Sequence, residues 1–212
     1  EQTLPNKRST LYGRALNIIL SEWSAQKRLE RDPIYEGFYP DLEKEMLAEI
    51  AYESFKKDQL FFSRDMITAR ISSFLSDTLD VPKRLDADAV LQAIEVQQGI
   101  LVERATDVYS FSHLTLQEYL TALYIVENRL EEDLVNLHLS DENWREVFLL
   151  VSGLTKNPVF RLLDLISQRA NSYIASFSII QEWVKWSSIN KTGISRLYQR
   201  AAVIAIASNS PG

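Results

Sequence analysis

Residues 99–120 have the sequence GILVERATDVYSFSHLTLQEYL. The runs 100–105 and 108–112 have the composition of short β-strands, and only Thr106 and Asp107 separate them. Two short strand-like runs joined by two residues predict a β-hairpin. From Leu116 onward the apolar residues follow a helical spacing. The segment therefore predicts a hairpin that leads directly into a helix.

Three helices and one short apolar run are predicted between residue 41 and the hairpin. The helices, placed by their apolar spacing, are expected over residues 42–55, 67–79 and 86–98. The apolar run, 60–62, lies between the first two helices. Ser63 and Asp86 stand where they can cap the second and third helices, and Gly99 can end the third in a left-handed conformation. The order helix, short strand, helix, helix, hairpin is that of a winged-helix domain.

Before this unit the sequence predicts one amphipathic helix and a linker. The helical stripe consists of Leu11, Ala15, Ile18, Ile19 and Trp23. The charged stretch that follows, from residue 24 to residue 40, is broken by prolines and a glycine, so it is predicted to be a linker.

Beyond the hairpin the chain is predicted to be helical to its end. The main candidates are residues 116–128, 141–153, 158–170, 174–186 and 195–207. Asp141 is a candidate cap and Gly153 a candidate stop. No motif repeats at a fixed period, so a regular solenoid is not expected. The predicted fold class is mainly α: a winged-helix domain over 41–128 with a small β-hairpin wing, followed by an irregular helical bundle over 129–212.

The composition narrows the function classes. With 46% hydrophobic and 25% charged residues, the 212-residue chain has the balance of a soluble globular protein. It has no cysteine, which removes disulfides and thiolate metal sites and agrees with a cytoplasmic location. A net charge of -6 disfavours nucleic acid and anionic membranes as partners. The chain begins at Glu1, and we expect it to be part of a longer protein.

The turn between the hairpin and the next helix contains the most informative residues. Thr115 and Glu118 have the spacing of a capping box, and Leu114 and Tyr119 that of a hydrophobic staple. These four residues are expected to form the structural cap of the turn. His113 then lies at the positive end of the helix dipole, where its imidazole can donate to an anion or bond a nearby carbonyl.

No catalytic residue and no metal site are predicted. No pair of glycines has the G-x-x-x-x-G-K-[ST] spacing of a phosphate-binding loop, and no serine has a G-x-S-x-G context. The second histidine, His138, is expected to have a surface or packing role near a helix end. We therefore expect this fragment not to be an enzyme.

A resemblance adds to these observations. Residues 111–119, FSHLTLQEY, resemble the motif that ends the winged-helix domain of NACHT-type STAND signalling ATPases. Residues 99–104 resemble the strand that opens the wing, and the segment with Leu4-Pro5, Leu11-Tyr12 and Trp23 is similar to the last helix of the helical domain after a NACHT core. The resemblance covers residues 1–128, and it implies that 1–40 hold the last helix of that preceding domain plus a linker.

The resemblance implies a regulatory and interaction module that holds the parent protein in its ADP-bound inactive state. His113 matches the histidine that contacts the β-phosphate of ADP in that family. It would sense nucleotide only together with the missing NACHT core, its intramolecular partner. The fragment itself is expected to hold no cofactor, whereas the parent would bind ADP or ATP with Mg and form homo-oligomers.

Two other functions remain open from the sequence. One is a winged-helix DNA-binding regulator with a helical dimerisation domain, and the other is a plain helical scaffold. A DNA-reading helix needs arginine and lysine. The helix predicted over 86–98 instead carries Asp86, Asp88 and Glu95 and no basic residue, so the regulatory hypothesis is preferred.

Overall fold

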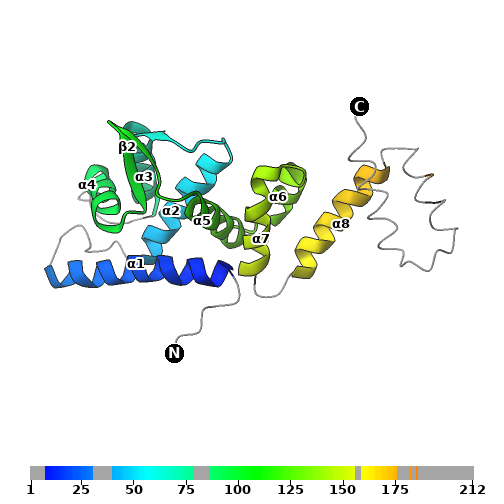
Figure 1. The fold of residues 1–212 in the computed structure, drawn as a ribbon, viewed down its shortest axis with the longest axis horizontal. Helices are drawn as coiled ribbons and strands as arrows, with labels where there is room; N and C mark the ends of the chain where they lie inside the picture. Colours follow the sequence, from blue (N-terminus) through cyan, green and yellow to red (C-terminus); the bar gives the residue numbers. More distant parts are fainter. Residues whose placement is uncertain are drawn as a thin grey trace.

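The computed structural model describes residues 8–30, 40–78, 86–155 and 159–175, with the single residues 182 and 185. Its helical elements are α1 (Arg8–Glu30), α2 (Pro40–Phe55), α3 (Arg64–Thr78), α4 (Ala87–Ala93), the π-helix η2 (Ile94–Gln98), α5 (Leu114–Glu127), α6 (Glu131–His138), the 3-10 helix η3 (Glu142–Trp144), α7 (Arg145–Leu154) and α8 (Val159–Ala175). The strands are β1 (Phe62–Ser63), β2 (Leu101–Ala105) and β3 (Val108–Phe111). Figure 1 shows α1 lying across the base of the winged helix and α8 at the opposite end of the molecule from α4.

The winged-helix order is confirmed. The strands form an antiparallel sheet in the order β1-β3-β2, in which Phe62 pairs with Tyr109 and Leu101 with Phe111. The hairpin between β2 and β3 is the predicted wing. At its tip Asp107 has a positive φ of 59°, which a short aspartate side chain tolerates.

The predicted caps at Ser63 and Asp86 and the left-handed Gly99 are also confirmed. The Ser63 Oγ accepts a hydrogen bond from the Met66 N–H at 3.3 Å, and the Asp86 side chain accepts from the Asp88 N–H at 3.2 Å. Gly99 closes η2 with φ 62° and ψ 24°. This left-handed backbone strains a residue that carries a Cβ, which is why glycine stands between η2 and the wing.

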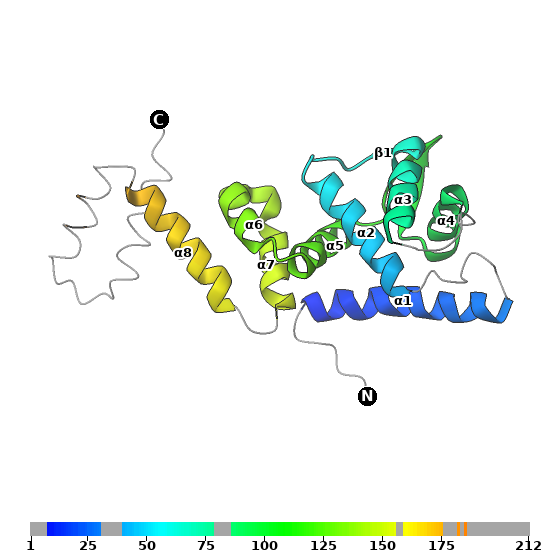
Figure 2. The same ribbon diagram turned by 180° about the vertical axis from the view of Figure 1, so that it is seen from behind.

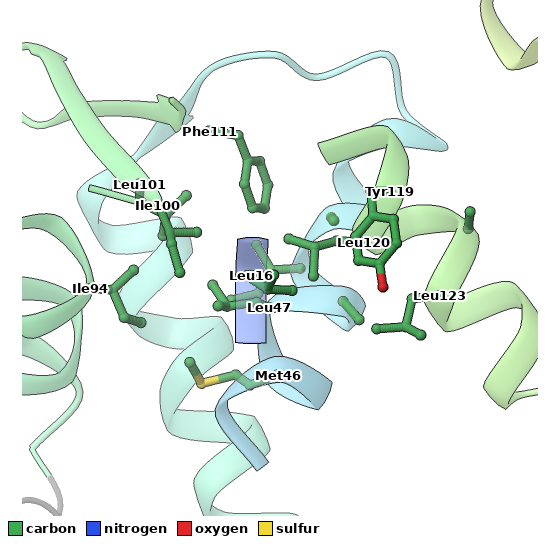
Figure 3. Packing of buried hydrophobic residues seen from close by; sticks show 14 of the residues in the cluster. Leu16, Met46, Leu47, Ile94, Ile100, Leu101, Phe111, Tyr119, Leu120 and Leu123 are labelled. Carbon is green, nitrogen blue, oxygen red and sulfur yellow. The ribbon is translucent and has the colours of Figure 1, made fainter. Parts of the chain in front are cut away.

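One hydrophobic core joins the winged helix to the elements on both sides. In its centre Leu47 of α2, Leu101 of β2 and Leu120 of α5 are fully buried, and Figure 3 shows Leu16 of α1 packed among them. The same cluster continues through Val147 and other buried residues of α6, α7 and α8. Apolar area removed from water is the main stabilising term in folding, so α1 and α7 are held to the winged helix by a shared core.

The predicted face of the first helix is wrong. Leu11, Ile18 and Ile19 are exposed, whereas Leu16 and Leu20 are buried at 1% exposure. The helix carries apolar residues on two faces, so its periodicity does not decide which face meets the core. The helix also continues to Glu30, so the predicted linker over 24–40 begins too early.

The close approach of α1 and α7 explains the face that is buried. A Cβ on Gly153 would lie 2.5 Å from the Ser9 Oγ, and Ser9 is itself buried. Gly153 was predicted to stop its helix, but α7 continues to Leu154. Gly153 therefore allows α1 and α7 to pack closely, and it does not end α7.

The remaining helices agree with the prediction in kind but not in every boundary. Asp141 caps η3, with its side chain accepting from the Asn143 N–H at 3.0 Å. The helix α6 was not among the predicted helices. The predicted helix over 195–207 and most of the one over 174–186 lie outside the described residues. Figure 2 shows α6 and α7 standing between the winged helix and α8.

No helix in the described ranges is both long and apolar enough to cross a membrane.

Candidate functional site

The turn between β3 and α5 presents His113. Its backbone is extended, with φ -136° and ψ 138°. Its carbonyl oxygen accepts hydrogen bonds from the N–H groups of Leu116 at 3.0 Å and Gln117 at 3.4 Å. His113 is therefore the N-cap residue of α5. Its side chain is exposed and makes no capping hydrogen bond, so the imidazole is directed to solvent at the start of the helix.

The predicted capping box is wrong. The helix begins at Leu114, two residues earlier than a Thr115 cap requires. Glu118 is then the fifth helical residue, one full turn and more beyond the cap, where a carboxylate cannot reach back to the cap N–H. The predicted Leu114 to Tyr119 staple is also wrong, because Leu114 is the first residue of the helix and is 52% exposed, whereas Tyr119 is buried.

This shift changes the electrostatics of the turn. No side chain caps the start of α5, and its first turn carries no acidic residue. The first N–H groups of a helix lack intrahelical acceptors and carry partial positive charge. The start of α5 thus offers exposed backbone donors beside the imidazole of His113.

Gln117 has a structural role. It is 2% exposed, and its Nε2 donates to the Ser54 Oγ at 3.0 Å and to the Gln59 carbonyl oxygen at 3.3 Å. These bonds join α5 to the end of α2 and the loop after it. Gln117 therefore fixes the position of α5, the helix that begins directly after His113.

Glu118 lies beside a groove and has no capping role. The groove has a volume of about 1180 Å³, and its walls come from the start of α1, the end of α2 and the loop after it, the start of α5, and α7 with the residues before it. Exposed apolar side chains on it are Leu60, Leu114 and Leu149. Burial, and then the nearby carboxylate of Glu146, raise the pKa of Glu118. Glu146 is itself held by Arg8 at 3.2 Å.

The second histidine is engaged with an aromatic ring. His138 stacks on Trp144, with ring centroids 3.8 Å apart and an interplanar angle of 14°. Trp144 is buried and meets Phe55 edge to face at 4.9 Å. The prediction of a surface or packing role for His138 is confirmed, and the stacked ring shows that the role is packing.

The helices α4 and η2, which stand where other winged helices read DNA, carry Asp88 and Glu95 and no basic residue. Asp88 forms an ion pair with Arg64 of α3 at 3.0 Å. In the described ranges no cluster of three or more histidine or acidic side chains is arranged to hold a metal ion.

The fold and this turn together define a winged-helix domain with helices attached before and after it. The family model of the winged helix-turn-helix domain C-terminal to NACHT matches residues 8–125. Because this match covers more than half of the chain, the chain belongs to that family. No curated protein and no solved structure matches it.

Proposed function

We propose that this chain is the non-catalytic regulatory module of a nucleotide-switched NACHT protein, and that His113 senses the phosphate of bound ADP. In this proposal the NACHT core of the same protein holds the nucleotide and its Mg. The winged helix docks on that core in the inactive state, with the start of α5 turned toward the phosphates.

The exposed N-cap histidine of α5 carries the proposal. An imidazole with no capping bond is available to donate to an anion, and the uncapped helix start places backbone N–H groups and a positive dipole end beside it. Helix starts of this kind bind phosphate in many nucleotide-binding proteins. Membership of a family of winged-helix domains that follow NACHT supports the NACHT core as the partner that would hold the phosphate near this turn.

The DNA-binding alternative has weaker support. Binding to DNA draws much of its free energy from lysine and arginine contacts to phosphates. The helices α4 and η2 carry acidic residues and no basic residue. Arg64 of α3 forms an ion pair with Asp88. The chain should therefore bind duplex DNA no better than other acidic proteins.

The test is the ADP affinity of the parent protein with His113→Ala. Loss of one hydrogen bond to a charged group removes about 1.5 to 3 kcal/mol, which is roughly a ten- to hundredfold weaker Kd for ADP by calorimetry. Because the lost contact belongs to the closed state, the open and active population should rise. Thr115→Ala is the matched control, since Thr115 is exposed at the same helix start and has no capping role.

Two results would contradict the proposal. One is an unchanged ADP Kd and basal activity for His113→Ala in a parent that still binds ADP. The other is an equal loss of affinity in Thr115→Ala, which would trace the effect to the shape of the turn and not to the imidazole.

A further inference from the structure

A buried carboxyl group lies where α2 meets the helix that leads to the wing. Glu43, in the first turn of α2, is only 1% exposed. Its Oε1 accepts a hydrogen bond from the Gln98 Nε2 at 2.7 Å. Gln98 is the last residue of η2 and precedes Gly99, which turns the chain into β2. This one bond thus joins the start of α2 to the base of the wing.

The bond leaves two oxygen atoms without partners. The Glu43 Oε2 and the Gln98 Oε1 are both buried and accept no hydrogen bond. An ionised carboxylate has only acceptors, so it cannot bond an amide oxygen. A neutral carboxyl group carries one O–H donor, and an acid and a primary amide that face each other can then exchange two hydrogen bonds. Each of the two residues has one buried oxygen without a partner. A proton on the Glu43 Oε2 would satisfy both oxygens, because the O–H could donate to the Gln98 Oε1.

We propose that Glu43 is protonated in the folded chain and that Glu43 and Gln98 form a proton-dependent clasp between α2 and the base of the wing. In the closed clasp the Glu43 Oε2–H donates to the Gln98 Oε1 while the Gln98 Nε2–H donates to the Glu43 Oε1. Loss of the proton leaves a buried charge held by a single bond, and the clasp loosens. This device is independent of nucleotide and of His113.

The electrostatic surroundings favour the neutral acid. Burial raises the pKa of Glu43 from 4.5 to about 7, and the Gln98 hydrogen bond opposes this only in part. No described charged group contributes to the shift in the pKa of Glu43. On the neighbouring helices, Arg70 of α3 lowers the pKa of Glu49, and Lys44 of α2 lowers the pKa of Glu127 of α5.

The charged side chains of α1, η2 and β2 named next are exposed or interact with other groups. Arg14 of α1 is exposed. Glu95 of η2 raises the pKa of Tyr109, through its charge and a hydrogen bond. On β2 the Glu103 carboxylate accepts from the Asp107 N–H at 2.8 Å, and Arg104 bonds Ser110 at 2.9 Å. Glu43 therefore has no described cation to stabilise its charged form.

The proposal fixes the sign of a pH effect. A carboxyl group whose pKa is higher in the folded state binds more protons when folded, so its contribution to stability is complete below pH 4.5 and is lost as the pH rises through about 7. Over this window the folding equilibrium constant should fall by roughly two orders of magnitude from this group alone.

The experiment compares the full chain with Glu43→Gln and with Glu45→Gln, an exposed control on the same helix. Glutamine at position 43 imitates the neutral acid, because its amide donates to the Gln98 Oε1 and accepts from the Gln98 Nε2. Glu43→Gln should match the wild type in urea denaturation at pH 5 and unfold at a higher urea concentration at pH 8. Glu45→Gln should follow the wild type at both values.

A direct titration serves if Glu43→Gln does not fold. The carboxyl carbon of Glu43, followed by NMR in the wild-type chain, should titrate close to pH 7. Titration near pH 4.5 would overturn the proposal. A Glu43→Gln stability curve that runs parallel to the wild type between pH 5 and pH 8 would also overturn it.

Discussion

The two histidines of the chain lie at comparable places, each beside the start or end of a helix, and their surroundings differ completely. His113 stands exposed at the start of α5 with no capping bond, whereas His138 at the end of α6 is stacked on the buried ring of Trp144 at 3.8 Å. A side chain engaged in packing contributes to stability, and one left exposed on a fixed backbone is available for a partner. The comparison separates the stabilising region around α6 and α7 from the region proposed to meet nucleotide.

The largest expected effect tests the packing side of this comparison. Trp144→Ala removes a buried ring that contacts Phe55 and His138, so it should lower the free energy of unfolding by about 3 to 5 kcal/mol. His113→Ala, at an exposed site, should change it by no more than about 0.5 kcal/mol. Urea denaturation of both variants measures the difference. Equal losses would mean that His113 is also a packing residue.

A smaller effect is expected within the His113 motif itself. Gln117→Ala leaves the Gln59 carbonyl oxygen without its 3.3 Å bond and removes the donor to Ser54, which should cost about 1 to 3 kcal/mol of stability. Gln59→Ala is the control, because only the backbone of Gln59 takes part in the bond. If both variants unfold at the same urea concentration, the hydrogen bonds between α5 and α2 do not contribute to the stability of the chain.

The smallest effect concerns the pH response of His138. Burial lowers the pKa of His138 from 6.5, with Lys56 adding to this and Asp141 opposing it. Its contribution to stability is therefore present above pH 6.5 and is lost as the pH falls below that value. His138→Phe keeps an aromatic ring on Trp144 and cannot be protonated, so it should lose less stability than the wild type between pH 7 and pH 5. A larger loss in the variant would contradict the stacking account.

The winged helix was predictable from the sequence because its signals are local. The hairpin, the caps at Ser63 and Asp86 and the left-handed Gly99 each depend on residues within a few positions of one another. The family motif around His113 is equally local. Local signals specify element order even where the partners of each element are unknown.

The errors arise where a distant element decides the outcome. Nothing near Thr115 shows that the helix begins at Leu114, since the Gln117 bonds that position α5 reach residues 54 and 59. The buried face of α1 depends in the same way on contact with Gly153. For Glu43 one signal was present: a charged residue three and four positions before Met46 and Leu47, on the buried face of α2.

The most direct test of the proposed function is to mix this chain with the separately produced NACHT core of its parent and measure their association by calorimetry. The account predicts binding when the core holds ADP, weaker binding to the nucleotide-free core, and roughly ten- to hundredfold weaker binding to the ADP-loaded core for the His113→Ala chain. The His138→Phe chain should bind as the wild type does. Association of equal strength with and without ADP, unchanged by His113→Ala, would contradict the account.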